Sequence, residues 1–335
     1  MKADGRSVAT GLTLGKFAPL HRGHQLVIET ALAEVENLIV LVYDCPETTR
    51  LSLEIRARWL RDLYPSVEVI EARGGPLEVG SDPVLTRAHD EYILRILEGR
   101  KVTHFYSSEF YGEHVSAALS AIDRRIDPAR ERVAVSGTAI RADAYRFRNF
   151  VCPRVYRDLV TNVVFLGAPS TGKTTLCEKL AAAYDTVWMP EYGREYWERH
   201  QVERRLPPAA LVEIAEVHVQ REEQRLLEAN RYLFTDTNAL TTLLFARYYH
   251  GSAAPHLETL ANGAVDRYDI TFLCDDDVPY DDTWDRSGEV NRSTMQRWTI
   301  EELERRAVEY TLLTGSLERR MFAVKEVLSA RRKFP

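Results

Sequence analysis

Residues 162–180 read "NVVFLGAPSTGKTTLCEKL" and join an apolar run, a glycine-containing loop and a helical pattern. The loop fits G-x-x-x-x-G-K-[ST], in which glycines let successive backbone N–H groups curl around phosphate oxygens. The helix that starts at Lys173 points its positive end at the same anion. The order of strand, loop and helix therefore predicts a phosphate-binding loop in an α/β unit.

Each residue type of this loop suits one part of a nucleotide. Lys173 can reach the β- and γ-phosphates, and the Thr174 hydroxyl can bind Mg²⁺. The residues predicted to contact ATP here are Gly167, Ala168, Pro169, Ser170, Thr171, Gly172, Thr174 and Thr175.

Two carboxylates follow predicted strands nearby. Glu191 comes just after "TVWMP", and Asp236 ends "RYLFTD". Because the carboxyl ends of parallel strands line the ligand crevice, both acids are predicted to converge beside Lys173. One would accept the proton of an acceptor hydroxyl while the other holds Mg²⁺. We assign the metal to Thr174 and Asp236, and both acids remain candidates for the base.

An acidic segment, residues 275–296, reads "DDDVPYDDTWDRSGEVNRSTMQ". It lacks the oxygen-ligand spacing of a calcium loop. We predict a kinase lid, in which an arginine closes over ATP and screens the moving phosphoryl charge. Arg286 is preferred over Arg292 for that role.

A second glycine loop, "GKFAPLHRGH" at residues 15–24, also lies between a strand-like run and a helical pattern. A metal site would need a third ligand nearby, and none is present in the sequence. The glycines and the helix N-terminus instead favour a phosphate, with His21 and His24 as hydrogen-bond donors. This arrangement predicts nucleotidyl transfer.

The segment "AVSGTAIR" at residues 134–141 supplies the other half of that site. Hydroxyls and backbone N–H groups at a helix start, together with Arg141, would hold the departing pyrophosphate. The residues predicted to bind ATP in this half of the chain are Gly15, Lys16, Phe17, Pro19, Gly23, Ser136, Gly137 and Thr138.

The length of 335 residues favours two domains, and we place them at residues 1–160 and 161–335. Strand-like runs alternate with helical patterns, so the predicted fold class is α/β, with two domains that each have a parallel sheet flanked by helices. The predicted strands are 8–15, 37–44, 66–72, 102–108, 131–137, 162–167, 185–191, 231–237 and 268–274. Long helices are predicted over 207–230 and 292–313.

The bulk composition excludes some classes of function. A net charge of -6 argues against a broad surface for nucleic acid or anionic membrane. The four cysteines are far apart and lack C-x-x-C spacing, which is typical of reduced thiols in a cytosolic protein. The N-terminus lacks the long apolar region of a signal peptide, so a cytoplasmic location is expected.

The motifs "GKFAPLHRGH" and "VSGTAIR" resemble the nucleotidyltransferase superfamily that carries a HxGH turn and a later S/T-x-x-R element. The further motifs are "YSSEFYG", "NVVFLGAPSTGKTTL", "PEYGREY", "FTDT" and "DD…RS". With them, nearly the whole chain is similar to the bifunctional nicotinamide-nucleotide adenylyltransferase/ribosylnicotinamide kinase family. The resemblance assigns a Rossmann-like nucleotidyltransferase domain to the first half and a P-loop kinase domain to the second.

The resemblance implies two ATP-dependent reactions. The second domain would phosphorylate nicotinamide riboside to nicotinamide mononucleotide (NMN), and the first would join NMN to AMP, giving NAD and pyrophosphate. ATP is then a co-substrate and Mg²⁺ the metal, with no tightly bound organic cofactor. The implied partners are ATP, nicotinamide riboside, NMN and NAD, without DNA or membrane, and a homo-oligomer is compatible with the sequence.

The resemblance also implies substrate-binding residues. The aromatic residues Trp188, Tyr192, Tyr196 and Trp197 could stack on a flat cationic ring. The residues assigned to nicotinamide and ribose are Trp188, Tyr192, Arg194 and Asn238. Those assigned to NMN are Ser107, Ser108, Glu109 and Tyr111.

The chain departs from the expected family pattern at two places and lacks one optional module. Asn238 stands where a second acid is expected, and residues 283–285 are not the small, neutral run expected before Arg286. The first predicted strand starts within about ten residues of Met1, which leaves no room for a helix-turn-helix module, so DNA binding is not expected.

Other functions remain to be distinguished. A phosphopantetheine adenylyltransferase joined to a dephospho-CoA kinase is disfavoured by "PEYGREY" and "FTDT". A nucleotide sensor, with one or both domains inactive, is disfavoured by the intact Lys173, His21 and Arg141. FAD synthesis would not need a P-loop, and an aminoacyl-tRNA synthetase would need a lysine-rich KMSKS-like loop.

Overall fold

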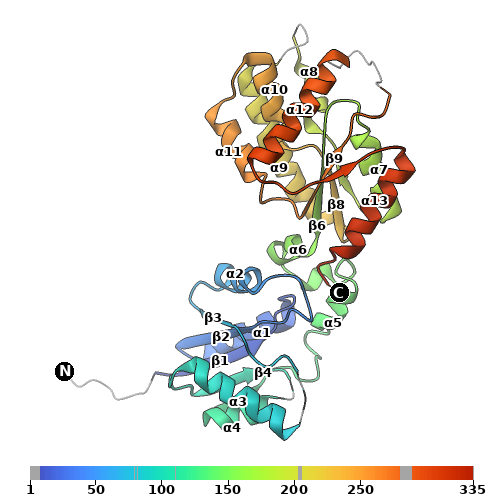
Figure 1. Cartoon of the computed structure of the whole chain (residues 1–335). Coiled ribbons are helices and arrows are strands. Elements are labelled where there is room, and N and C mark those ends of the chain that lie inside the picture. Colours follow the sequence, from blue (N-terminus) through green and yellow to red (C-terminus); the bar gives the residue numbers. More distant parts are fainter. Residues whose placement is uncertain are drawn as a thin grey trace, which may run out of the picture. The chain divides into compact units, whose positions relative to one another are not determined.

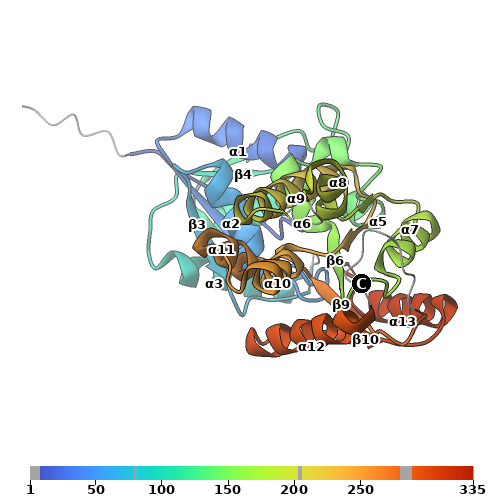
Figure 2. The same ribbon diagram turned by 90° about the horizontal axis from the view of Figure 1, so that it is seen from above.

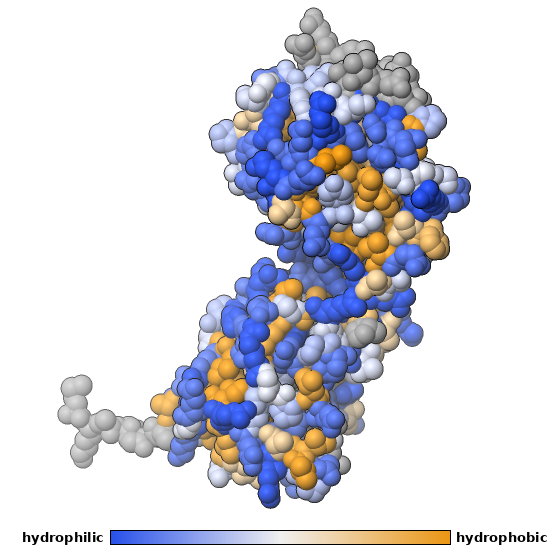
Figure 3. Space-filling model, in the orientation of Figure 1, coloured by the Kyte–Doolittle hydropathy of each residue, from blue (hydrophilic) through white to orange (hydrophobic). Residues whose placement is uncertain are grey.

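The computed structural model describes residues 8–334 except 79, 81, 110, 203–205 and 280–288. It divides into two compact units, the first ending at Tyr156 and including Lys333, the second spanning Arg157–Arg332. Each unit is a parallel sheet with helices on both faces (Figure 1). Polar and charged side chains cover much of the visible surface of both units (Figure 3).

The first unit has the strand order β3-β2-β1-β4-β5, and all its pairings are parallel. Its strands are β1 Thr10–Gly15, β2 Asn37–Tyr43, β3 Glu68–Ala72, β4 His104–Ser107 and β5 Ile122–Arg125. Its helices are α1 Arg22–Glu34, α2 Leu53–Leu63, α3 Pro83–Leu97, α4 Gly112–Leu119 and α5 Gly137–Ala142, followed by the short 3-10 helix η1 Arg148–Phe150. Helix α6 Pro153–Leu159 spans the division between the units.

The order of strands reverses between β1 and β4, which are neighbours in this sheet although they are far apart in the chain. In open parallel sheets such a switch point opens a crevice at the carboxyl ends of the strands. Gly15 ends β1 and Ser107 ends β4. The fold therefore brings the glycine–histidine turn and the segment after Ser107 to the same edge.

The second unit has the strand order β10-β9-β6-β8-β7, again with parallel pairings. Its strands are β6 Thr161–Leu166, β7 Trp188–Met189, β8 Tyr232–Asp236, β9 Ile270–Cys274 and β10 Thr311–Leu313. Its helices are α7 Lys173–Ala183, α8 Tyr192–His200, α9 Pro208–Glu228, α10 Ala239–His250, α11 Pro255–Gly263, α12 Glu289–Arg305 and α13 Leu317–Ala330. Strand β10 and helix α13 follow α12 along one edge of this sheet (Figure 2).

The core of the second unit lies on both faces of β6, whose six residues are all buried. Val163 and Phe165 pack with apolar side chains of α7 and α13, whereas Val164 and Leu166 pack with those of α9, α10 and α11. Burial on both faces explains why β6 is a continuous apolar run rather than an alternating one. The loop at its end is therefore held on a rigid base.

The predicted α/β class with two parallel sheets is confirmed, but two predicted elements are wrong. Residues 131–137 form no strand, because Asp127 accepts hydrogen bonds from the backbone N–H groups of residues 131, 132 and 133 and holds them in a turn. The fifth strand is Ile122–Arg125 instead.

The predicted helix over 292–313 ends early, at Arg305. Ala307 has a φ of 52°, and the N–H of Val308 donates to the Leu303 carbonyl at 2.9 Å. A left-handed residue with this bond is a typical helix C-cap. The chain is then free to pair residues 311–313 with β9.

Two smaller findings bear on the expected class of protein. All four cysteines are free, and Cys45, Cys177 and Cys274 are buried. Within the described part of the chain, the helices lack the combination of length and apolar character that a membrane crossing requires.

Candidate functional site

The loop between β6 and α7 has the backbone of a phosphate cradle. Gly167 has a φ of 135°, and a Cβ there would lie 2.5 Å from the carbonyl oxygen of Cys274, so only glycine fits. Helix α7 begins at Lys173. The Lys173 Nζ donates to the carbonyls of Gly167 at 3.0 Å and Ala168 at 2.8 Å, which places its charge within the curl of the loop.

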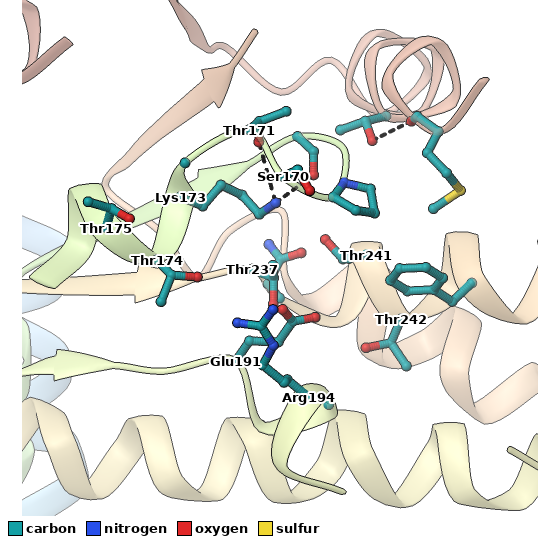
Figure 4. A pocket seen from close by; sticks show the side chains of 18 of the residues that line it. Ser170, Thr171, Lys173, Thr174, Thr175, Glu191, Arg194, Thr237, Thr241 and Thr242 are labelled. Atoms are coloured by element: carbon teal, nitrogen blue, oxygen red, sulfur yellow. Dashed lines mark hydrogen bonds between the residues drawn. The ribbon is translucent and has the colours of Figure 1, made fainter. Parts of the chain in front are cut away.

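A cavity of about 550 Å³ opens beside this loop. The P-loop residues predicted to contact ATP line it, apart from Ala168, whose side chain is buried. Figure 4 shows Glu191 and Arg194 across the cavity from Ser170 and Lys173, with Thr241 and Thr242 of α10 on a further side. The cavity is large enough for a nucleoside next to a triphosphate tail.

The two predicted carboxylates occupy different places. Asp236 is fully buried, its Oδ2 accepts a hydrogen bond from Thr174 Oγ1 at 2.5 Å, and its Oδ1 has no hydrogen-bond partner within the described residues. Glu191 precedes α8 and lines the cavity. One acid therefore lies behind the P-loop threonine, and the other faces the space where a substrate would bind.

The Thr174–Asp236 pair fits a magnesium site. Mg²⁺ at a nucleotide is held by one or two protein oxygens, with phosphate and water completing its shell. A buried carboxylate oxygen without a partner, next to a hydroxyl, supplies that protein share. The described residues contain no group of three or more His, Cys, Asp or Glu side chains that could hold a metal by themselves.

Side chains of helices α12 and α13 form hydrogen bonds to the backbone of the P-loop. Gln296 accepts from the Ala168 N–H at 2.8 Å and donates to the Cys274 carbonyl at 3.1 Å. Arg320 is buried and donates to the Thr171 carbonyl at 2.6 Å and the Asp275 carbonyl at 3.1 Å. The sequence analysis missed both residues, because neither belongs to a motif.

The lid prediction is only partly placed by the structure. Arg286 lies outside the described residues. Arg292, the less preferred residue, is buried on α12 and its Nη2 donates to the Ser170 carbonyl at 3.2 Å. This contact brings Arg292 to the P-loop.

The aromatic lining of the cavity comes from three positions, Trp197 of α8 and Phe245 and Tyr249 of α10. Of the predicted substrate residues, Arg194 and Asn238 also line the cavity.

Trp188 and Tyr192 do not line this cavity, although the sequence analysis assigned them to nicotinamide. Trp188 packs on the hydrophobic cluster that contains Leu180 and Phe234. The ring of Tyr192 lies under the Arg221 guanidinium, 4.1 Å away. Phe245 and Tyr249 could not be found from the sequence, since α10 carries no motif.

The first unit places His21 and His24 in contact at the start of α1. His21 Nδ1 accepts from the Gly23 N–H at 3.1 Å, and His24 Nδ1 accepts from the His21 N–H at 3.4 Å. The two rings stack with centroids 3.8 Å apart. Since each Nδ1 is an acceptor, each neutral ring carries its proton on Nε2 and offers an N–H donor there.

The electrostatic surroundings keep both imidazoles neutral. Burial, with the positive charges of Arg130 and Arg141, lowers the pKa of His21 to about 4. Burial also holds the pKa of His24 well below 6.5, assisted by His21 and Arg130. Arg130 is a site residue that the sequence analysis missed.

Arg141 joins the histidine turn to α5. It donates to the Ala18 carbonyl at 2.7 Å and to Thr138 Oγ1 at 3.0 Å. A Cβ on Gly137 would lie 3.1 Å from Arg141 Nη1 and 4.0 Å from His21 Nε2, so the two predicted halves of this site adjoin. Ser136 caps α5 by accepting from the Ala139 N–H at 3.1 Å.

The other predicted residues of the turn have structural contacts. Phe17 packs edge-on to His24 with centroids 4.9 Å apart, and Pro19 is buried. Lys16 forms an ion pair with Glu47 at 2.6 Å. Gly15 and Gly23 lie at the end of β1 and in the first turn of α1.

The segment predicted to bind NMN lies at the carboxyl end of β4. Ser107 is buried, and its Oγ has no hydrogen-bond partner within the described residues. Glu109 forms an ion pair with Arg130 at 3.1 Å, and the Tyr111 hydroxyl donates to the Leu14 carbonyl at 3.4 Å. Ser108, between them, is half-buried. These contacts tie the segment to β1 and to Arg130.

The two folds and the two candidate phosphate sites are typical of nucleotide-binding transferases with two domains. Residues 12–143 match the cytidylyltransferase-like family, and residues 162–320 match the AAA domain family. The chain is 28% identical over 326 residues to the "Trifunctional NAD biosynthesis/regulator protein NadR" of Escherichia coli, covering 90% of this chain and 77% of that protein. The protein of that name from Salmonella typhimurium gives the same identity and coverage.

Two solved structures share the fold of the whole chain. One is a NadR protein in complex with NAD and AMP-PNP, 22% identical with a TM-score of 0.56, covering 96% of both chains. The other is a NadR protein in complex with NR, 21% identical with a TM-score of 0.57, covering 96% of this chain and 95% of that one. The chain is therefore similar to NadR proteins over most of its length, with a nucleotidyltransferase-like domain followed by a P-loop kinase-like domain.

Proposed function

We propose that this chain is a bifunctional enzyme of NAD salvage, with a kinase step in residues 161–335 and an adenylyl-transfer step in residues 1–160. The kinase would convert nicotinamide riboside to NMN with ATP, and the transferase would convert NMN and a second ATP to NAD and pyrophosphate. The observation that carries the proposal is the cavity bounded by the P-loop, Glu191 and three aromatic side chains. The proposal includes Mg²⁺ as the metal and the cytoplasm as the location.

In the kinase step, the P-loop amides and Lys173 would hold the ATP phosphates. Thr174 and Asp236 would hold Mg²⁺, which neutralises phosphate charge when bound. Glu191 would accept the proton of the 5′-hydroxyl as its oxygen bonds to the γ-phosphorus and the bond from that phosphorus to the bridging oxygen breaks. ADP leaves with the bridging oxygen.

The aromatic side chains suit the substrate of this step. The nicotinamide ring of the riboside is flat and carries a positive charge. Trp197, Phe245 and Tyr249 line the cavity, and the face of an aromatic ring attracts such a cationic ring. Arg194, on the same wall as Glu191, would contact phosphate oxygens rather than the cationic ring.

In the transferase step, a phosphate oxygen of NMN would attack the α-phosphorus of ATP, and pyrophosphate would leave. The Nε2–H donors of His21 and His24 are neutral and held in place before substrate binds. Such donors stabilise the charge that develops on the α-phosphate oxygens. Arg141, beside Thr138, would bind the departing pyrophosphate.

The test uses the purified chain with ATP, Mg²⁺ and nicotinamide riboside, and mass spectrometry to detect NMN and NAD. We expect NAD from the wild type. Lys173→Ala should block NMN formation but still convert added NMN to NAD. His24→Ala should still form NMN from the riboside but should not convert NMN to NAD. If neither riboside nor NMN is converted, the proposal is wrong, and phosphopantetheine is the next substrate to try.

A further inference from the structure

His218 is a buried imidazole on the cavity wall that the mechanism above does not use. It belongs to α9 and is 4% exposed. Its side chain lines the kinase cavity, and its Nε2 has no hydrogen-bond partner within the described residues. Buried polar atoms in folded proteins nearly always have a partner, so an unpaired one at a cavity points to a ligand group.

The helical repeat explains how His218 reaches the cavity. Leu211, Ile214 and His218 are spaced by three and four residues, so they share one face of α9, and all three line the cavity. The two apolar neighbours offer His218 no hydrogen bond. The imidazole is thus a polar group at the end of an apolar stripe.

Glu191 shares this wall of the cavity. A Cβ built on Gly193 would lie 3.4 Å from Ile214 Cγ2 and 3.8 Å from Glu191 Oε1. The glycine lets the start of α8 approach α9 closely. It therefore places the carboxylate that would accept the 5′-hydroxyl proton close to the face that carries His218.

The ionisable groups around His218 leave it neutral and available. Burial lowers its pKa, against the opposing effects of the Glu222 and Asp236 charges. Glu222, one turn further along α9, already accepts hydrogen bonds from Asn162 at 2.6 Å, Arg267 at 2.9 Å and Tyr268 at 3.0 Å. The ring also forms a hydrogen bond to the Thr237 backbone, which favours its charged form, so Nε2 is the ring nitrogen left for a ligand hydroxyl.

We propose that His218 Nε2 hydrogen-bonds the 2′- or 3′-hydroxyl of the nucleoside in the kinase site and so selects for an intact ribose. The inference rests on the proposed kinase function. In that site the aromatic residues contact the base and Glu191 faces the 5′-hydroxyl, which leaves the ribose hydroxyls to be recognised. A site built to bind a hydroxyl rejects an analogue that lacks it, because its own polar group is then left unpaired.

The test measures kcat/KM for nicotinamide riboside and for its 2′-deoxy and 3′-deoxy analogues. The enzymes are the wild type, His218→Met and His218→Gln. Methionine removes the polar group at similar volume, whereas glutamine can place an amide near the position of Nε2. His256, an exposed histidine of α11 that pairs with Glu216 at 2.7 Å, provides a matched control as His256→Met.

We expect the wild type to discriminate against one of the two deoxy analogues by about tenfold or more, as loss of one hydrogen bond would give. His218→Met should lose about the same factor on the riboside, mainly in KM, and should no longer discriminate against that analogue. His218→Gln should recover part of the discrimination. His256→Met should behave as the wild type.

Equal losses on all three substrates, or unchanged discrimination in an active His218→Met, would overturn the inference while the proposed function stands. ATP binding, measured with a fluorescent analogue, reports whether each variant keeps a folded kinase domain. If the methionine variant does not fold, the glutamine variant decides by the same comparison. A wild-type chain that phosphorylates no nicotinamide riboside refutes the proposed function, and this inference with it.

Discussion

The Thr174 hydroxyl donates to Asp236 Oδ2 over 2.5 Å, although the two residues are 62 positions apart in the chain. Thr174 stands in the first turn of α7, and Asp236 is the last residue of β8. The pairing of β6 with β8 brings them together. This contact joins two separate motifs into the pair that we propose to hold Mg²⁺ beside the P-loop.

Asp236→Asn should lower the rate of NMN formation by a factor on the order of 100 or more, because a neutral amide does not offset the positive charge of a divalent cation as a carboxylate does. Titration with Mg²⁺ should show a higher half-saturating concentration than for the wild type. NAD formation from added NMN, in the same preparation, should be unchanged. Retention of NMN formation within threefold would argue against the metal role.

Glu191→Gln should lower kcat of the kinase step by a factor of about 10² to 10⁴, the range for loss of a general base. The half-saturating Mg²⁺ concentration should stay at the wild-type value, which separates this variant from Asp236→Asn. Glu195, in the first turn of the helix α8 that follows Glu191, is paired with Arg221 at 2.6 Å and provides the control. A Glu195→Gln variant that is equally impaired would show that the charge of α8, and not a base, is required.

The first unit should lose stability below neutral pH. The pKa of His21 is about 4 in the fold and 6.5 when unperturbed, so the unfolded chain binds a proton that the folded chain excludes in this window. The stability is fully present above pH 6.5 and is lost as the pH falls toward 4. Between pH 8 and pH 5 this histidine alone should cost about 2 kcal/mol.

Urea unfolding of the wild type and His21→Asn at the two pH values tests this expectation. Asparagine keeps a capping acceptor at the start of α1 but does not titrate. The variant should therefore lose less stability on acidification. An equal loss in both proteins would mean that His21 does not contribute.

Arg320→Met should destabilise the second unit by about 3 kcal/mol, since it leaves buried carbonyls and the Asp277 carboxylate without their partner. The KM for ATP should rise, because the Thr171 carbonyl belongs to the P-loop. Arg319→Met, at the exposed neighbouring position, should stay within about 0.5 kcal/mol of the wild type. Urea unfolding and ATP kinetics on both variants provide the check.

The sequence was sufficient for elements whose pattern is local. The P-loop, the histidine turn and the buried strands β1, β2, β6, β8 and β9 could be predicted because the residues themselves show the apolar runs and the glycines. Strand β5 could not, because Ile122–Arg125 is an exposed edge strand of mostly charged residues. The turn held by Asp127 imitates a strand in sequence, since "VAV" carries the strand-forming side chains.

The residues of the candidate kinase site also fall into those that local sequence patterns predict and those that they do not. Glu191 and Asp236 could be predicted because parallel strands end at one edge of a sheet. Phe245, Tyr249 and His218 lie on helices α10 and α9, and only the packing of these helices brings them to one cavity. Trp188 was assigned to the substrate because it belongs to an aromatic cluster near the predicted crevice, whereas its partly buried side chain packs against the core cluster that contains Leu180 of α7.

The contact of Arg320 on α13 with the P-loop limits how far the kinase domain can be shortened at its carboxyl end. Arg320 of α13 donates to the Thr171 carbonyl of the P-loop, although the two residues are more than 140 positions apart in the chain. The Nε of Arg320 also donates to the carbonyl of Gly315, just before α13, at 3.0 Å. A shortened chain that keeps every kinase motif but stops before α13 would lack this support. Removing α13 from the carboxyl end should therefore abolish nucleotide binding although every kinase motif is still present.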